Sequence, residues 1–136
     1  MMQELSRKLG EMEYDGLITD LTPPTQVGAG TIAKLDAEAV YKRGTVLAKS
    51  AKDGKLRILG TTPPTPESGQ TADVYTPDCI LCDDTQVGTT DDVTVCVYTA
   101  GCFDPEKLAA AKNYTLTEAD KDKLRGYSIV LKAASK

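Results

Sequence analysis

The clearest structural signal in the sequence is a strict alternation of apolar and polar residues over positions 93–98. Val93, Val95 and Val97 fall on one face of an extended chain, and the intervening residues fall on the other. Side chains alternate between the two faces of a β-strand, so this period of two predicts a half-buried strand. A strand of this kind needs neighbours to pair with, and the chain must therefore form a sheet.

Further strands are predicted from short apolar runs separated by Gly, Pro, Asp and Thr residues. The Asp-Gly pair at positions 53–54 favours a tight hairpin between two of these runs. The Pro/Thr/Gly-rich stretch 60–76 is long for a connection without regular structure, so we expect an exposed or functional loop. The predicted strands are residues 39–41, 45–49, 55–59, 78–82 and 127–131.

Helical signals are confined to the C-terminal part of the chain. Asp104 supplies an N-cap and is followed by a proline, which predicts a helix over residues 105–112. Thr117 and Asp120 resemble a capping box, so a second short helix is predicted to end before Gly126. Strands followed by short helices and a closing strand indicate an α+β fold that is mainly β, with short C-terminal helices.

The hydrophobic core of such a fold must be small. Leu, Ile, Val and Phe together make up about a fifth of the 136 residues, just above the level at which chains become disordered. A small core is often supplemented by contacts with other subunits or partners. We therefore expect the protein to form an oligomer.

Residues 1–31 are interpreted as an extended N-terminal arm that precedes a β-rich domain at residues 32–136. The first part of the arm is charged and carries Leu5, Leu9 and Met12 at helical spacing, which predicts a short helix at best. The last part is rich in Gly, Pro and Thr, a composition typical of chains that are disordered in isolation.

The middle of this arm, residues 14–21, alternates like a strand. Pro23 and Pro24 prevent a hairpin return, so the segment has no neighbour in sequence to pair with. An unpaired extended segment can gain hydrogen bonds by adding to a sheet edge of another protein, with Leu17 and Thr19 among the residues that face it. The candidate binding residues are Tyr14, Leu17, Ile18, Thr19, Leu21, Pro23 and Pro24.

Composition disfavours several classes of function. The chain has no histidine, which removes Ser-His and Cys-His nucleophile pairs and the commonest metal ligand and general base. The net charge of −4 argues against nucleic acid as a partner, because phosphate neutralisation needs a basic surface. No apolar run is typical of a membrane span or a secretory signal, so we expect a cytoplasm-made protein without membrane association.

The four cysteines support an alternative hypothesis, a small zinc or thiol adaptor. Cys79, Cys82, Cys96 and Cys102 supply the number of thiolates that a structural zinc site needs. The spacing argues against zinc, because Cys79 and Cys82 lie three apart in an apolar strand and face opposite sides. We expect buried or half-buried free thiols instead. If residues 79–83 and 93–98 form a hairpin in the register that sets Cys82 opposite Cys96, a disulfide could form there late, and another register would exclude it.

Two acidic pairs, Asp83-Asp84 and Asp91-Asp92, flank the loop between the cysteine-bearing strands. Paired carboxylates can bind calcium or take part in acid–base catalysis, but the spacing of a calcium-binding loop is not present. We expect ordinary solvated turn residues, each replaceable by Asn with a change in stability below ~0.5 kcal/mol.

Several segments between residues 43 and 131 occur in a characteristic order. The runs 44–49 and 55–59 flank a turn, and residues 79–85 form an apolar strand that continues into a polar turn. Residues 93–103 end in Tyr-x-x-Gly-x-Phe, and a short helix and a strand close the series. In this order, and over about two-thirds of the chain, the sequence resembles the lambda-type head decoration proteins of tailed bacteriophages.

The resemblance implies a homotrimer that binds the outside of an expanded phage head at three-fold and local three-fold positions. There it would clamp neighbouring subunits of the major capsid protein, through an arm that becomes ordered on the capsid. It implies no enzymatic activity and no cofactor, synthesis in the host bacterial cytoplasm, and a final location on the capsid exterior of the virion. The charged residues 1–13, the loop 60–76 and the cysteines depart from the family pattern. Two alternatives stay open, the zinc or thiol adaptor and a β-rich ligand-binding domain that uses the loop 60–76.

Overall fold

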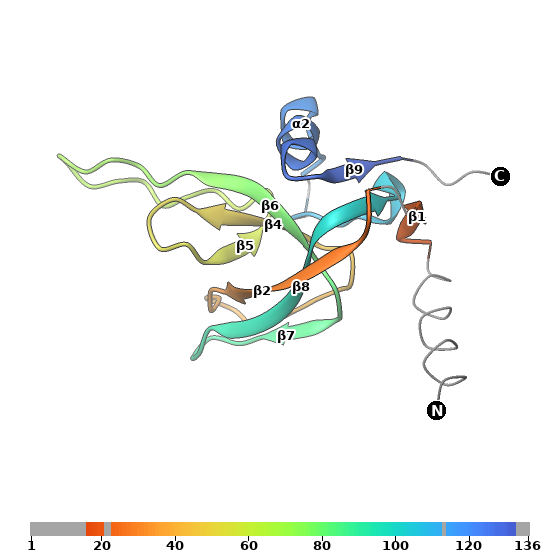
Figure 1. Ribbon diagram of the computed structural model, residues 1–136. Helices are drawn as coiled ribbons and strands as arrows, with labels where there is room; N and C mark the ends of the chain where they lie inside the picture. The colour runs from red at the N-terminus through yellow and green to blue at the C-terminus, as the bar shows by residue number, and fades with distance from the viewer. Residues whose placement is uncertain (1–15, 21–22, 113, 133–136) are drawn as a thin grey trace.

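The computed structural model describes residues 16–20, 23–112 and 114–132 (Figure 1). These residues form an α+β fold that is mainly β, as the sequence predicts. In chain order the elements are β1 (Ile18–Asp20), β2 (Gln26–Ile32), β3 (Ala39–Tyr41), β4 (Val46–Ser50), β5 (Leu56–Ile58), β6 (Tyr75–Leu81), β7 (Thr85–Val87), β8 (Val93–Phe103), the 3₁₀ helix η1 (Pro105–Lys107), α2 (Glu118–Gly126) and β9 (Ile129–Leu131).

The longest strand, β8, organises the sheet. Its first part pairs with β2 on one side, and its middle pairs with β6 on the other. The strands β4 and β5 complete a ring of five, because β6 pairs with β4, β4 with β5, and β5 with β2 (Figure 1). The last of these contacts is a single residue pair, Ile32 and Leu56. The outer edge of β2 over residues 26–31 therefore has no strand partner within the described chain.

The C-terminal end of β8 leaves this ring and takes two new neighbours. Ile18 of β1 pairs antiparallel with Phe103, and Leu131 of β9 pairs parallel with the same residue from the opposite side. Both short strands lie on the same side of the molecule, below α2 (Figure 1). The strands β3 and β7 form a separate two-stranded sheet.

The alternation of the ring strands divides the core into two clusters. Alternate residues such as Leu47, Leu81 and Val97 join one cluster, to which all five ring strands contribute. Their sequence neighbours, such as Val46 and Ile80, join a second cluster that includes residues of β1, α2 and β9. Val93, Val95 and Val97 all contact the first cluster, which confirms that they share one face of the strand.

Most of the predicted strands are confirmed, and β6 and β8 are longer than predicted. The predicted helix over residues 105–112 is wrong, because only the 3₁₀ turn η1 forms and Leu108 is extended. Backbone pairing explains the difference. Ala109 donates to the carbonyl of Gly44 at 3.1 Å and accepts from Val46 at 2.8 Å, so this segment bonds to the chain beside β4 instead of to itself.

The second predicted helix is confirmed as α2. Thr117 and Asp120 form the full capping box, each side chain accepting from the backbone N–H of the other residue. The helix continues through Gly126, one residue further than predicted. The left-handed conformation that follows the helix belongs to Ser128, with φ of 68°.

The proposed start of the compact part at residue 32 is wrong, because β2 belongs to the sheet. Residues 26–32 pair with β8 along their whole length. The segment is rich in Gly and Thr and weak in local strand signal, and the exposed side of β8 supplies the partner that orders it. The domain therefore includes at least β1 and β2, and residues 1–31 are not one continuous free arm.

Candidate docking surface

Leu17 lies in the core and does not face outward. Its side chain is only 2% exposed and packs in the second cluster with Phe103. Its carbonyl accepts a hydrogen bond of 2.8 Å from the backbone N–H of Asp104, which continues the pairing of β1 with β8. The expectation that Leu17 faces a partner protein is therefore wrong.

The next residues are also bound to the domain. The Thr19 hydroxyl donates to the Lys132 carbonyl at 2.9 Å, and the Asp20 carboxylate lies 3.4 Å from the Lys132 ammonium. Ile18 is half-buried against the second cluster. Pro23 and Pro24 exclude a hairpin return, but the C-terminal end of β8 pairs with this segment instead. Thr19 lies beside Cys102, 83 positions later in the sequence. The predicted absence of a pairing partner is thus wrong for residues 17–20.

The remaining candidate binding residues have mixed outcomes. Tyr14 and Leu21 lie outside the described residues. Pro23 is half-buried and Pro24 is exposed, and both precede β2 directly. Together the structure brings residues 17–20 onto the domain and places the two prolines at the start of an edge strand.

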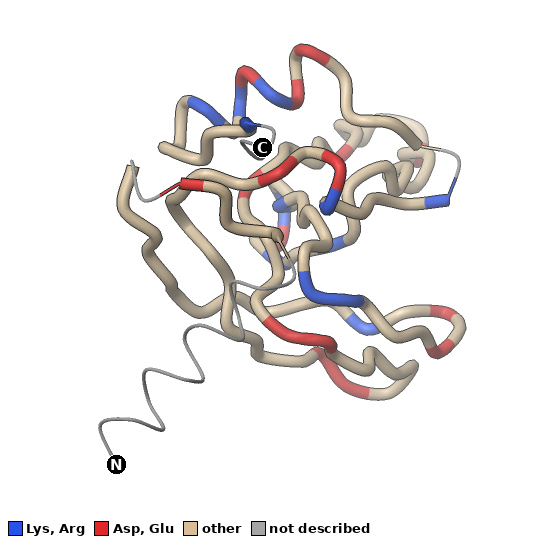
Figure 2. The backbone as a smooth tube through the Cα atoms, turned by 90° about the vertical axis from the view of Figure 1, so that its right-hand side faces the viewer, with Lys and Arg blue, Asp and Glu red and all other residues tan. Residues whose placement is uncertain are grey.

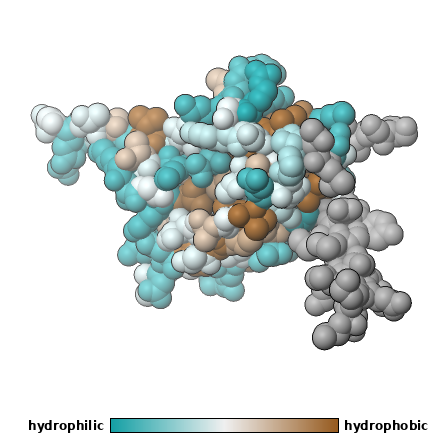
Figure 3. Space-filling model, in the orientation of Figure 1, coloured by the Kyte–Doolittle hydropathy of each residue, from teal (hydrophilic) through white to brown (hydrophobic). Residues whose placement is uncertain are grey.

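The open edge of β2 is a candidate docking surface that sequence patterns did not indicate. The Ala33 N–H donates to the Leu56 carbonyl at 2.9 Å, so the backbone groups of odd-numbered residues in β2 point away from β8. The backbone N–H and C=O groups of Val27 and Ala29 therefore face the open edge, N-terminal to the single contact between Ile32 and β5. The Val27 side chain is 61% exposed, and apolar surface is visible over this region in Figure 3.

An open edge of this kind is a template for a strand from another chain. Proteins usually protect such edges with Lys, Pro or a bulge. The seven residues of β2 contain neither Lys nor Pro, and the pairing with β8 is irregular only between Gln26 and Val27, at the start of the strand. A seven-residue strand without these residues is the signal in the sequence that could have identified the surface. This signal was overlooked because the segment is rich in Gly, and such a composition favours the interpretation as a disordered tail.

The cysteines do not converge on one site. Cys79 lies in the first core cluster and Cys82 in the second, Cys102 is buried beside Thr19, and Cys96 is exposed. Nowhere in the described chain do three or more potential metal ligands come together. The N–H of Cys82 donates to the carbonyl of Cys96 at 3.2 Å, so the expected juxtaposition of these two residues is confirmed.

The thiols are predicted to differ sharply in reactivity. Burial raises the pKa of the Cys79 and Cys82 thiols, which keeps them protonated and unreactive at neutral pH. Iodoacetamide should therefore alkylate Cys96 in the native protein and leave the three buried cysteines unmodified. Peptide mapping by mass spectrometry checks this result, with the urea-denatured protein as the control that reacts at all four. Rapid native alkylation at Cys82 would contradict the packing described here.

Two of the four acids between β6 and β8, Asp84 before β7 and Asp92 before β8, have structural partners. The Asp84 carboxylate accepts from the Arg43 N–H at 2.8 Å, and this hydrogen bond lowers the pKa of Asp84. The Asp92 carboxylate accepts from the Lys34 N–H at 2.9 Å and pairs with the Lys55 ammonium at 2.7 Å. The expectation of plain solvated turn residues is wrong for both. Charges of both signs are interspersed over the molecule, most regularly along α2 (Figure 2).

The long loop before β6 projects from the domain (Figure 1). Residues 65–72 are all exposed, which confirms the expected exposure of the loop. Its base is held in place, because the Ser50 hydroxyl donates to the Asp73 carboxylate. Nearby, the Arg57 guanidinium donates to both carboxylate oxygens of Asp53, at 3.2 and 2.9 Å.

The Asp53–Arg57 pair predicts a pH dependence of stability. The hydrogen bond from Arg57 holds the pKa of Asp53 well below its usual value of about 4. A lowered pKa in the folded state stabilises the fold above the unfolded-state value, and this contribution is lost as the pH falls through the folded-state pKa. The free energy of unfolding should therefore fall below pH ~4, and less steeply in Asp53→Asn. Urea titrations of the native chain and of Asp53→Asn between pH 7 and pH 2 measure the free energy of unfolding. Equal slopes of this free energy against pH would contradict the lowered pKa of Asp53.

No described helix is long and apolar enough to cross a membrane. Comparison with protein-family models and with curated protein sequences gave no match.

Proposed function

We propose that this protein is a structural virion protein, a homotrimeric decoration protein that binds the exterior of an expanded phage head. The order of sequence segments supports this proposal through its resemblance to lambda-type decoration proteins. In this role the protein has no enzymatic activity and needs no cofactor. Its partners are the major capsid protein and two further copies of itself.

The observation that carries the proposal is the position of the N-terminal strands at open sheet edges. Over residues 26–31, N-terminal to Ile32, β2 pairs with β8 on one side and has no strand on the other side within the described chain. A strand of a capsid subunit can add to this edge and bond to the backbone of Val27 and Ala29. The capsid contact proposed from sequence thus moves from a free arm to an ordered edge.

An ordered edge binds better than a free arm of the same length. Fixing the backbone of one residue costs about 1–2 kcal/mol, and β8 has already ordered β2 before any capsid contact forms. In a trimer three such edges act together, so weak individual contacts give strong overall binding. This arrangement explains how a chain with a small apolar core could clamp a large shell.

Co-sedimentation with expanded, undecorated heads of the phage that encodes the chain tests the proposal. The full chain should bind to saturation, and analytical ultracentrifugation should give the mass of a trimer. A variant that lacks residues 1–15 leaves Leu17 and both N-terminal strands in place, so it should remain trimeric. A full-length chain that does not sediment with heads, or a monomer at micromolar concentration, would overturn the proposal.

A further inference from the structure

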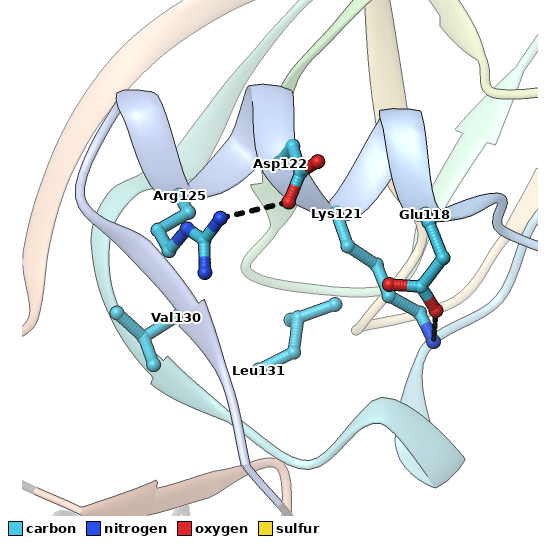
Figure 4. Close-up of a pocket in the computed structure, with 6 residues that line it drawn as sticks. All are labelled: Glu118, Lys121, Asp122, Arg125, Val130 and Leu131. Atoms are coloured by element: carbon cyan, nitrogen blue, oxygen red, sulfur yellow. Dashed lines mark hydrogen bonds and ion pairs between the residues drawn. The ribbon is translucent and has the colours of Figure 1, made fainter.

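Two neighbouring hollows share Lys121 of α2 in their lining. The first, of about 230 Å³, lies between α2 and β9 and is lined by Lys121, Arg125, Val130 and Leu131 among others (Figure 4). The second, of about 210 Å³, lies between η1 and the segment that leads into α2. Lys121 lines both hollows, so they lie on either side of its side chain. We call the combined surface the α2 groove.

The lining of the α2 groove is partly apolar. Its large side chains pack against the second core cluster but are only partly buried, so each presents part of its surface to the groove. Apolar surface is visible at this position, below α2 (Figure 3). These side chains are Leu108, Ala110, Tyr114, Leu116 and Leu131, and the half-buried Val130 also lines the groove.

The rim of the α2 groove is charged but adaptable. In Figure 4 the charged side chains of α2 stand over Val130 and Leu131. The ion pairs are Arg125–Asp122 at 2.8 Å and Lys121–Glu118 at 3.6 Å, each between residues three apart on the helix. Exposed pairs of this kind contribute little, so they can rearrange to admit a ligand. A half-buried apolar floor with such a rim fits an amphipathic segment better than a small polar molecule.

We propose that the N-terminal segment of the same chain, residues 1–13, occupies the α2 groove. Four of its apolar residues, Met2, Leu5, Leu9 and Met12, are spaced three and four apart, which places them on one face of a helix. Methionine has a flexible, polarisable side chain that fills irregular apolar surfaces. An isolated segment of this length does not hold a helix in water, so packing in the groove supplies the stabilisation it lacks.

The point at which this segment joins the domain supports this choice of occupant. The chain enters the described structure at Gly16, which bends with φ of 75° beside the side chain of Lys107 in η1. The next residue, Leu17, bonds to Asp104, which precedes Pro105 on the lining of the groove. Residues 14–16 alone separate the proposed segment from Leu17, which is bonded beside the groove lining, so reaching the groove needs no long linker.

Docking in the same chain gives the N-terminal segment a role that does not depend on capsid binding. It covers the partly exposed side of the second core cluster, which is otherwise open to water. The stabilisation would be present in the free protein, before any head is encountered. The inference therefore stands or falls separately from the proposed function.

Photo-crosslinking in the full chain tests the inference. A diazirine amino acid replaces Leu9 in one sample and Arg7, on the opposite side of the predicted helix, in a matched control. Each protein is mixed with an equal amount of its ¹⁵N-labelled form before irradiation, so that crosslinks within one chain and between chains differ in mass. We expect crosslinks from position 9 to peptides that contain residues 108–116 or 129–131, within one chain, and their loss at position 7.

Two results would overturn the inference. Crosslinks from position 9 that join labelled to unlabelled chains would show that a second copy occupies the groove. The absence of groove peptides among the crosslinks would show that the segment binds elsewhere. A second measurement guards against a reactive group that disturbs docking. In Leu5→Asp/Leu9→Asp, backbone amides of residues 114–116 and 129–131 should exchange hydrogen faster than in the native chain, and unchanged exchange would contradict docking.

Discussion

Replacement of Leu17 by Ala should lower the free energy of unfolding by about 3 kcal/mol, because it empties a filled position in the core. Leu17 is 2% exposed and packs with Phe103, although it lies near the N-terminus in a segment that sequence patterns assign to a free arm. Urea denaturation followed by circular dichroism measures the change. Val27→Ala, at a residue that is 61% exposed, is the control and should change stability by less than ~0.5 kcal/mol.

A small effect of Leu17→Ala would contradict the placement of β1. The free-arm hypothesis predicts no change in stability, because a residue outside the domain has no packing to lose. The two accounts thus differ by about 3 kcal/mol, far more than the uncertainty of a urea titration.

Gly44→Ala should lower the free energy of unfolding by about 3 kcal/mol or more. Gly44 has φ of 94°, a conformation that side chains rarely adopt. A Cβ atom at this position would also lie 2.7 Å from the carbonyl oxygen of Lys107, a backbone atom that cannot move aside cheaply. The two penalties act together where the chain between β3 and β4 passes η1.

Gly69→Ala is the matched control for this substitution. Gly69 also has positive φ, at 84°, but a Cβ there meets no atom within 4 Å. Gly69→Ala should therefore lower the free energy of unfolding only by the conformational strain, about 1–2 kcal/mol. Equal losses in the two variants would show that contact with Lys107 contributes nothing, and would contradict the close approach of η1 to this turn.

Local signals in the sequence predicted the elements that depend on local chemistry. The alternation of residues 93–98 identified β8, and the Asp-Gly pair identified the hairpin of β4 and β5. The capping box of Thr117 and Asp120 identified the start of α2. The juxtaposition of Cys82 and Cys96 was predicted for one register of the two strands, and the pairing of β6 with β8 has that register.

Elements that depend on distant partners were not predictable in the same way. The alternation of residues 14–21 indicated the extended conformation of β1, but no local signal identified its partners, Cys102 and Phe103. The same holds for Ala109, whose pairing beside β4 prevents the helix that its surroundings favour. The open edge of β2 escaped prediction because it is defined by a missing neighbour, which depends on the path of β5.

The central claim, that the open edge of β2 binds the phage head, is tested most directly by a pair of exposed valines. Val27 lies on β2 and is 61% exposed, and Val74 lies before β6 and is 58% exposed. A lysine on an edge strand discourages pairing with another chain, while either substitution should leave the fold intact. In co-sedimentation with expanded, undecorated heads, Val27→Lys should lose binding and Val74→Lys should bind as the native chain does. Full binding by folded Val27→Lys would contradict the claim.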